Sequence, residues 1–315
     1  MPSHDALIPE ENAEAIARRF GASGERFLRE LPQRVADIAG RWHLTLGEPL
    51  PIGIGSYLVA ARMPDGHEAV LKVSPTGGEQ DNANELEAYA LRRWGGEGAV
   101  RLFDADAASG ALLIERCVPG ISIDSIPDKQ MVTAACELAR RLHRPADAED
   151  ERLVPSAVAD VAERAARFDE AMQAMGHPLS RHAERVIKGF HDALAVNDSA
   201  LVVCHGDMNP GNLLAAERMD WLAVDPLPVR APAAYDAASL VWAKRRWVLA
   251  EPDPAAVLEC RVSLAATAIG AEAREVRAWT LVRVAGILID RFAWGGYNEA
   301  PFISVAELLC QTIAE

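Results

Sequence analysis

Apolar positions in the early part of the chain fall into short runs, and each run ends at a turn signal. Apolar runs of about four to eight residues bounded by turn residues are typical of strands. Asp65-Gly66 and Ser109-Gly110 lie between such runs and are hairpin signals, because glycine accepts the positive φ of tight turns. Residues 85–94 instead have helical spacing, with Leu91 and Trp94 on one face. The pattern predicts a small antiparallel sheet with one helix, whose strands lie within residues 50–60, 68–73, 99–106 and 111–116.

Most of the remaining chain has the periodicity of amphipathic helices. Residues 10–40 carry such a pattern, and we expect this segment to pack on the small lobe that contains the sheet. Val118-Pro119-Gly120 breaks the chain out of the sheet, so we place a boundary between residues 116 and 117. The prediction is an α+β protein with a small-sheet lobe and a mainly helical lobe. Helices of the second lobe are predicted at residues 131–144, 156–175, 181–196, 255–268, 275–293 and 305–314.

The strongest chemical signal is the segment from Cys204 to Leu214. It places Asn212 five residues after Asp207, the spacing of the protein-kinase catalytic loop, and Asp225 follows at the end of an apolar run. Phosphoryl transfer uses such a set: one carboxylate faces the attacking hydroxyl, while an amide oxygen and a second carboxylate bind Mg²⁺. The alternative is an ordinary Asp/Asn turn between strands.

The hairpin after this loop should bring the two metal ligands together. Two short apolar strands flank the polar residues 217–220, so folding back returns Asp225 to the neighbourhood of Asn212. Oxygen ligands of this kind suit Mg²⁺, which demands octahedral oxygen coordination. Asp207 is predicted to be the catalytic base. His205 is an alternative base, but directly after an apolar strand we favour a packed histidine that braces the loop.

A second half-site is predicted upstream. Lys72 lies inside an apolar run, where its ammonium needs an anionic partner such as a nucleotide phosphate or a helix carboxylate. Glu87 shares the inward face of its helix with Leu91 and Trp94, so we expect it to hold Lys72, with Glu85 as the alternative. An edge-strand lysine that points to solvent is the other interpretation.

Two further segments are candidates for contact with ATP. A glycine turn contains Gly53, Gly55 and Ser56, whose backbone and hydroxyl groups could contact phosphate, although it lacks the full G-x-G-x-x-G pattern. In a two-lobed kinase the break after residue 116 is the hinge, whose backbone binds adenine. Glu115 and Cys117 would line this hinge, mainly through main-chain atoms.

The chain resembles the aminoglycoside phosphotransferase branch of the kinase-like fold, and it is most similar to the streptomycin 6-kinase and hydroxyurea phosphotransferase group. The resemblance implies a two-lobed protein-kinase-like fold, Asp207 as catalytic base, and Asn212 and Asp225 as Mg²⁺ ligands. It also implies that Lys72 contacts the ATP phosphates and that the acid of Tyr235-Asp236 braces the catalytic loop. The segments that carry the likeness are residues 91–102, 111–116, 205–212 and 221–236.

The sequence departs from the family pattern at three places. Asn209 stands where many members have a second histidine, and Met208 replaces the loop leucine. Residues 227–231 replace a glycine-containing stretch after the metal-binding aspartate, and they include Arg230. An arginine and a branched side chain there should change the wall of the acceptor pocket, so we expect streptomycin to be a poorer substrate than a smaller or less cationic compound.

The amino-acid composition limits the classes of molecule that the protein is expected to bind. The 315 residues carry a formal net charge of −14, which argues against nucleic acid because a phosphate backbone requires a basic face. The charge favours cationic acceptors, although acidic surfaces also serve solubility. Five cysteines without C-x-x-C pairs indicate reduced thiols and a cytoplasmic location. The chain begins without a signal-peptide pattern, and no apolar run approaches the ~18 residues of a membrane span.

These observations predict an ATP- and Mg²⁺-dependent phosphotransferase that acts on a hydroxyl group of a small molecule, of which an aminoglycoside-type antibiotic is the foremost candidate. Residues 1–116 would form a helical extension and the nucleotide-binding lobe, and residues 117–315 would hold the catalytic loop and acceptor site. A kinase for a metabolite, sugar or hydroxyurea-like acceptor and a non-catalytic nucleotide-binding module remain alternatives. A protein kinase is disfavoured, because Asp225-Pro226-Leu227 replaces D-F-G and no A-P-E follows.

Overall fold

The computed structural model describes residues 7–51, 55–77, 79–196, 200–293 and 299–313. The chain divides into two compact units. The first comprises Met1–Gly120 together with Ala215–Leu222, and the second comprises Ile121–Leu214 together with Ala223–Glu315.

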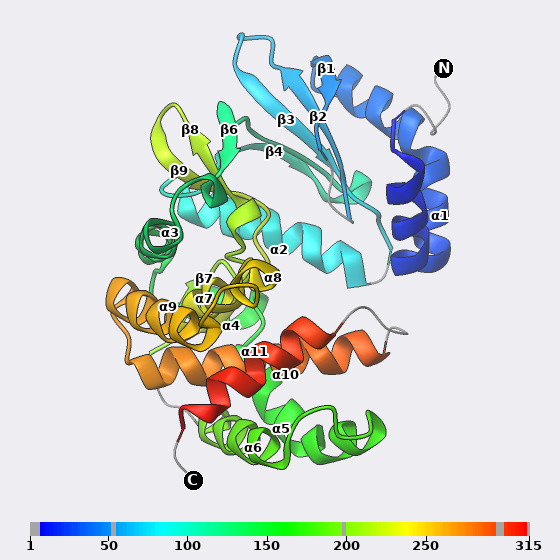
Figure 1. Ribbon diagram of the computed structural model, residues 1–315. Coiled ribbons are helices and arrows are strands. Elements are labelled where there is room, and N and C mark those ends of the chain that lie inside the picture. Colours follow the sequence, from blue (N-terminus) through cyan, green and yellow to red (C-terminus); the bar gives the residue numbers. More distant parts are fainter. Residues whose placement is uncertain (1–6, 52–54, 78, 197–199, 294–298, 314–315) are drawn as a thin grey trace. The chain divides into compact units, whose positions relative to one another are not determined.

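The first unit is built on a five-stranded sheet with the order β1-β2-β3-β5-β4, in which every pair of neighbours is antiparallel (Figure 1). The predicted small antiparallel sheet is therefore confirmed. Turn chemistry explains the hairpins: Gly66 at φ 90° lies between β2 and β3, and Gly110 at φ 65° lies just before β5. The strands are β1 (Thr45–Pro49), β2 (Tyr57–Arg62), β3 (Glu68–Val73), β4 (Leu102–Asp106) and β5 (Ala111–Glu115).

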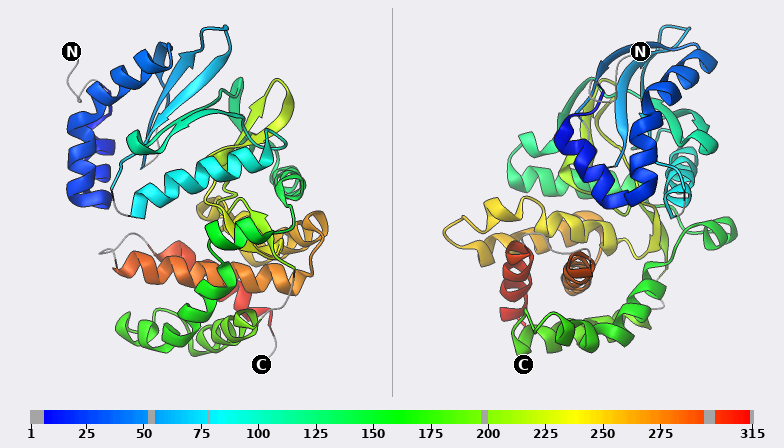
Figure 2. Two further views of the ribbon diagram at one scale, coloured as in Figure 1. Left: turned by 180° about the vertical axis from the view of Figure 1, so that it is seen from behind. Right: turned by 90° about the vertical axis from the view of Figure 1, so that its right-hand side faces the viewer.

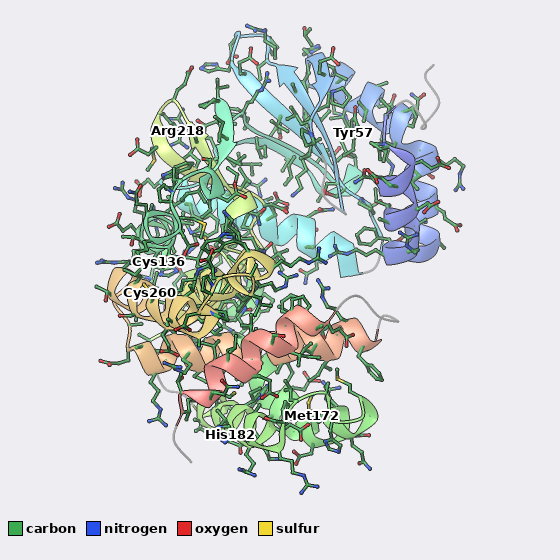
Figure 3. All side chains as sticks on the ribbon, viewed as in Figure 1. Tyr57, Cys136, Met172, His182, Arg218 and Cys260 are labelled. Atoms are coloured by element: carbon green, nitrogen blue, oxygen red, sulfur yellow. The ribbon has the colours of Figure 1, made fainter. Side chains whose placement is uncertain are left out.

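Two helices complete this unit. The helix α1 (Glu10–Arg41) breaks at Gly21, and its apolar residues share one core with Tyr57 of the sheet, as residues 10–40 were predicted to do (Figure 3). The helix α2 (Glu79–Trp94) begins six residues earlier than residues 85–94 predicted. The first strand was also misplaced, because β1 ends at Pro49, before the predicted segment 50–60 begins. In Figure 2, α2 is the cyan helix that lies beside the sheet.

The second unit is mainly helical, as predicted. All six predicted helices are present to within a few residues at most ends, but three short helices, α4, α7 and α8, were not predicted. Its helices are α3 (Asp128–Leu142), α4 (Ala148–Leu153), α5 (Ala157–Ala174), α6 (Arg181–Ala195), α7 (Ala234–Trp242), α8 (Arg245–Val248), α9 (Pro254–Ile269), α10 (Ala273–Ala293) and α11 (Ala300–Gln311).

Short strands carry the functional loops. The strand β7 (Val202–Cys204) pairs with β10 (Val229–Ala231) in an antiparallel ribbon. The strands β6 (Pro119–Ser122), β8 (Leu213–Ala216) and β9 (Met219–Ala223) form a separate sheet with the order β6-β8-β9. The β8–β9 turn is only two residues long, Glu217-Arg218, which is tighter than the predicted turn of residues 217–220.

Among the described residues, no single helix has both the length and the apolarity needed to cross a membrane. Within the same described residues, α9 and α10 would meet that test as a pair, but they are bent by 115° at the break between them. All five cysteines of the sequence are free thiols.

Candidate active site

The predicted catalytic loop begins where β7 ends and is shaped first by its glycine. Gly206 has φ 83°, and a Cβ atom on it would lie 1.8 Å from the carbonyl oxygen of Leu227. Leu227 in turn donates its N–H to the carbonyl of His205 at 2.9 Å. No side chain fits at position 206, which explains why glycine stands where protein kinases have arginine.

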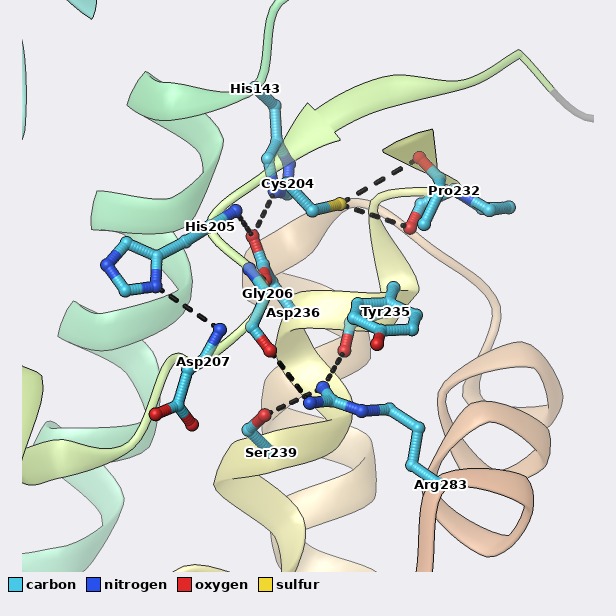
Figure 4. Close-up of polar contacts among 11 residues, drawn as sticks. His143, Cys204, His205, Gly206, Asp207, Pro232, Tyr235, Asp236, Ser239 and Arg283 are labelled. Atoms are coloured by element: carbon cyan, nitrogen blue, oxygen red, sulfur yellow. Dashed lines mark hydrogen bonds and ion pairs between the residues drawn. The ribbon is translucent and has the colours of Figure 1, made fainter. Parts of the chain in front are cut away.

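Asp236, near the start of α7, holds the backbone of this loop (Figure 4). Its carboxylate accepts hydrogen bonds from the amides of His205 and Gly206, both at 2.8 Å, and from His143 Nε2 at 2.9 Å. Burial alone would raise the pKa of Asp236, but these donors and the His143 charge hold it below its ordinary value. Asp236 is therefore an ionised brace, the role that the family resemblance implies.

His205 uses both ring nitrogens within the loop. Its Nδ1 accepts a hydrogen bond from the Asp207 amide at 3.3 Å, and its Nε2 donates to the Val224 carbonyl at 3.0 Å. Burial lowers the pKa of His205 and favours this neutral ring. A neutral imidazole with both nitrogens engaged suits the bracing role, which we favour over that of a base.

Arg283 of α10 is a further support of the loop that the sequence patterns did not reveal. Its guanidinium donates to the Gly206 carbonyl at 2.8 Å, to the Tyr235 carbonyl at 2.9 Å and to Ser239 Oγ at 2.8 Å (Figure 4). It also lies over the Tyr235 ring, 4.1 Å from the centroid. The available signal was a charged residue between apolar neighbours, Leu281-Val282 and Val284-Ala285, because such a charge needs a partner.

The Asp207 carboxylate is oriented by two amides of its own loop. Asn212 Nδ2 donates to both the carbonyl oxygen and Oδ2 of Asp207 at 3.0 Å, and Asn209 Nδ2 donates to Oδ1. Burial raises the pKa of Asp207 above its ordinary value, and the nearby Asp225 charge adds to this. His205, Arg283 and the Asn212 hydrogen bond act in the opposite direction.

Asp225 returns to the neighbourhood of Asn212, as the hairpin predicted. The Val224 amide donates to the Asn212 carbonyl at 2.9 Å, which places the next residue beside that asparagine. Asp225 has φ 56°, a conformation that few non-glycine residues adopt and that often marks functional positions. Because Asn212 Nδ2 is bound to Asp207, its amide oxygen is the atom left to face a cation. This oxygen and the Asp225 carboxylate fit Mg²⁺ in donor type.

Lys72 and Glu87 form the centre of the half-site in the first unit. Lys72 Nζ donates to Glu87 Oε2 at 2.6 Å, and both side chains are buried, with exposed fractions of 7% and 6%. The predicted ion pair with Glu87 is therefore present. Glu85, the alternative, is exposed and borders a hollow lined by Arg26 and Thr76.

The other residues predicted to contact the nucleotide lie in varied surroundings. Ser56 Oγ shares a 2.8 Å hydrogen bond with Ser74 Oγ, and no atom lies within 4 Å of a Cβ built on Gly55. Gly53 lies outside the described residues. Cys117 is half-buried, and burial raises its pKa to about 12. The Glu115 side chain binds Arg218 and the Arg101 amide. A contact of Glu115 with adenine could therefore come only from its main chain.

Several acids that could have received a cationic acceptor are already in ion pairs. Arg164 of α5 binds Asp160 at 2.8 Å and Asp290 of α10 at 3.0 Å. Glu163 likewise binds Arg167 at 2.9 Å. These contacts neutralise much of the negative charge on α5.

Comparison with solved structures defines the class of protein. The chain is similar to the aminoglycoside phosphotransferase APH(4)-Ia, with a TM-score of 0.60 and 12% identity over 90% of this chain and 100% of that one. It is also similar to the choline kinase LicA from Streptococcus pneumoniae, with a TM-score of 0.59 and 11% identity over 90% and 99% of the two chains. The fold is therefore the two-lobed kinase-like fold that the sequence predicts.

Comparison of sequences gives the family. The chain is 31% identical to a streptomycin 6-kinase of Streptomyces glaucescens, with 88% of each chain covered. It is 30% identical to a hydroxyurea phosphotransferase of Kitasatospora aureofaciens, over 88% of this chain and 78% of that one. The model of the aminoglycoside/hydroxyurea antibiotic resistance kinase family matches residues 41–287, and the chain belongs to that family. It is thus a phosphotransferase that uses ATP and acts on small molecules.

Proposed function

We propose that the protein transfers the γ-phosphoryl group of Mg²⁺-bound ATP to a hydroxyl group of an antibiotic of the aminoglycoside type. The observation that carries the proposal is the arrangement of Asp207, Asn212 and Asp225, in which one asparagine orients the base and presents an oxygen beside a second carboxylate. An aspartate turn with no catalytic role would not require the buried supports from Asp236 and Arg283.

In this proposal Asp207 accepts the proton of the acceptor hydroxyl as that oxygen attacks phosphorus. Its raised pKa makes it a better proton acceptor than an exposed aspartate. Asn212 and Asp225 would hold Mg²⁺, which shields the phosphate charge. Lys72 would bind the α- and β-phosphates, with Glu87 fixing its position. Gly55, Ser56 and the main chain at Glu115 and Cys117 remain proposed nucleotide contacts.

The decisive experiment is an ATP-dependent phosphorylation assay against aminoglycosides, hydroxyurea and sugars, with mass spectrometry of the products. Transfer to an aminoglycoside hydroxyl supports the proposal, and the absence of transfer to any acceptor refutes it. The metal assignment has its own test, in which calorimetry measures Mg²⁺–ATP binding. Asp225→Asn should weaken binding more than Asn212→Ala, because it removes a full charge at the metal. Unchanged binding in Asp225→Asn would refute that assignment.

A second candidate acceptor is a small, weakly charged hydroxyl compound related to hydroxyurea. Arg230 favours it, because this partly buried residue of β10 adds positive charge five residues after Asp225. The similarity to a hydroxyurea phosphotransferase points in the same direction. The acceptor assay separates the two candidates. A cytoplasmic location, where ATP is available and thiols stay reduced, is part of the proposal.

A further inference from the structure

Arg218 stands at the tip of the β8–β9 hairpin, the segment that joins the two proposed metal ligands Asn212 and Asp225 (Figure 3). The turn consists of Glu217 and Arg218 alone. The proposed phosphoryl transfer gives no role to Arg218 or to the Glu115 side chain that it binds. The residues Ala215–Leu222 belong to the first unit, so the contacts of Arg218 are internal to that unit.

Each guanidinium nitrogen of Arg218 donates to an acceptor. The Nε and one terminal nitrogen bind the two carboxylate oxygens of Glu115, at 2.6 Å and 2.8 Å. The terminal nitrogens also bind the carbonyl oxygens of Gly96 and Ala99, both at 2.7 Å. A planar fork that binds a carboxylate through two nitrogens is the geometry that arginine provides and lysine cannot.

The three residues that accept these hydrogen bonds, Gly96, Ala99 and Glu115, form a binding site for the Arg218 side chain, called its receptor here. Gly96 has φ 86°, and a Cβ atom on it would lie 2.8 Å from Arg101 Cγ and 3.5 Å from Arg218. Glu115 Oε2 also accepts the Arg101 amide at 3.0 Å. The side chains of Arg218 and Glu115 are 24% and 15% exposed. Exposed isolated ion pairs contribute little, but this pair is largely shielded and belongs to a network of hydrogen bonds.

We infer that Arg218 is a positioning residue for Mg²⁺–ATP, and this inference rests on the proposed function. The hairpin has a metal ligand on either side, and its base is tied by the Val224–Asn212 backbone hydrogen bond. Anchoring the tip through Arg218 restrains the hairpin and, through it, the spacing of the two ligands. Such outer supports of metal ligands typically change metal affinity or activity by roughly 10- to 100-fold when they are removed.

The same contacts give a structural role to two of the segments that carry the family resemblance. Residues 91–102 contain Gly96 and Ala99, and residues 111–116 contain Glu115. Both segments supply acceptors for Arg218. On this reading they form the receptor of the hairpin, whatever else the main chain of Glu115 contacts.

The test uses Arg218→Met, which keeps the length of the side chain but removes its donors, and Arg218→Lys, which keeps the charge. Circular dichroism first establishes that each variant is folded. The ATP-dependent reaction is then titrated with Mg²⁺, and ATP binding is measured by calorimetry at several Mg²⁺ concentrations. Arg218→Met should require about 10- to 100-fold more Mg²⁺ in both measurements, with little change in the KM of the acceptor. Arg218→Lys should be intermediate.

Arg62→Met is the matched control, because Arg62 forms an exposed ion pair with Glu68 in the same sheet and should show the wild-type Mg²⁺ dependence. In a double-mutant cycle, Glu115→Gln should add little to Arg218→Met, because both changes break the same contact. Wild-type Mg²⁺ dependence in folded Arg218→Met, or full additivity in the cycle, overturns the inference. If the wild-type protein itself phosphorylates no acceptor, the proposed function fails instead.

Discussion

At the scale of single residues, the proposed chemistry depends on the Asp207 carboxylate, which two amides of its own loop orient. Asp207→Ala should reduce turnover by on the order of 10²- to 10⁴-fold, the usual contribution of a positioned acid or base. The affinity for ATP should change little, because Asp207 is proposed to face the acceptor. Steady-state kinetics together with calorimetric ATP binding provide the check. Near-wild-type turnover in a folded Asp207→Ala protein would show that another group accepts the proton.

A second residue links pH to stability away from the proposed active site. His191 of α6 is fully buried, its Nδ1 donates to the Ile187 carbonyl at 3.1 Å, and its ring contacts Phe168 of α5. Burial is the main cause that lowers the pKa of His191 below 6.5, and the Arg164 charge adds to this. The hydrogen bond to Ile187 and the charges of Asp192 and Asp160 oppose it. Below pH 6.5, His191 therefore binds a proton in the unfolded chain but stays neutral to a lower pH in the folded protein.

The expected result is a loss of folding free energy as the pH falls below 6.5, by at most about 1.4 kcal/mol per pH unit from this group. His191→Gln, which stays neutral, should flatten the dependence. Urea unfolding of both proteins at pH 7.5 and about pH 5.5 measures the difference in slope. His205, whose pKa burial also lowers, contributes equally to both proteins and cancels. Parallel slopes would mean that His191 is not the group responsible.

At the scale of elements, the catalytic loop depends on its close approach to the segment before β10. Gly206→Ala would place a methyl group 1.8 Å from the Leu227 carbonyl, at a backbone φ of 83°. Together the overpacking and the backbone strain should cost about 2–4 kcal/mol of unfolding free energy. Gly211→Ala is the control, because no atom lies within 4 Å of its Cβ. Denaturant unfolding tests this, and equal stability of the two variants would contradict the steric argument.

The elements also show which parts of the fold the sequence could predict. Strands β3, β4 and β5 and their turns were predictable because hairpins are local and glycine marks the turns. The strands β6 and β10 were not, because their sequences, Pro-Gly-Ile-Ser and Val-Arg-Ala, are neither apolar runs nor long enough to show alternation. Pairing with distant strands creates them, as when Val229–Ala231 pairs with Val202–Cys204.

The same reasoning applies to the candidate site. The contact between Asp207 and Asn212 follows from a spacing of five residues, and Lys72 with Glu87 follows from one helix face. Arg283 and Arg218 were missed because their partners are distant in the sequence: Gly206 is 77 residues from Arg283, and Glu115 is 103 residues from Arg218. No local pattern encodes contacts of that range.

At the scale of the whole molecule, the net charge of −14 and the positive charge of Arg230 make opposite predictions for a polycationic acceptor. Arg230 Nε donates to the Val154 carbonyl at 2.9 Å, so its position is fixed. Repulsion of about 1 kcal/mol at partly exposed distances would lower kcat/KM for streptomycin by roughly fivefold. Arg230→Gly should therefore shift preference towards aminoglycosides, as measured by kcat/KM for streptomycin and for a neutral acceptor.

Arg230→Met provides the control, because it removes the charge while keeping much of the side chain's bulk. If kcat/KM for streptomycin rises equally in the Arg230→Met and Arg230→Gly variants, the charge is the cause. If it rises only in Arg230→Gly, the bulk of the side chain at the pocket wall is the cause. Efficient phosphorylation of streptomycin by the wild type, unchanged in both variants, would show that the overall acidic charge dominates.

The first unit is built from two separate segments of the chain, and this has a consequence for its biosynthesis. Arg218 follows Glu115 by 103 residues, so a ribosome that has finished β5 must extend the chain by that length before the partner of Glu115 exists. At translation rates of about 5–20 residues per second, this takes roughly 5–20 s. During that interval the Glu115 carboxylate and the carbonyls of Gly96 and Ala99 are without the guanidinium that binds them in the folded chain. The first unit therefore acquires its last eight residues, Ala215–Leu222, only after the proposed catalytic loop has been synthesised.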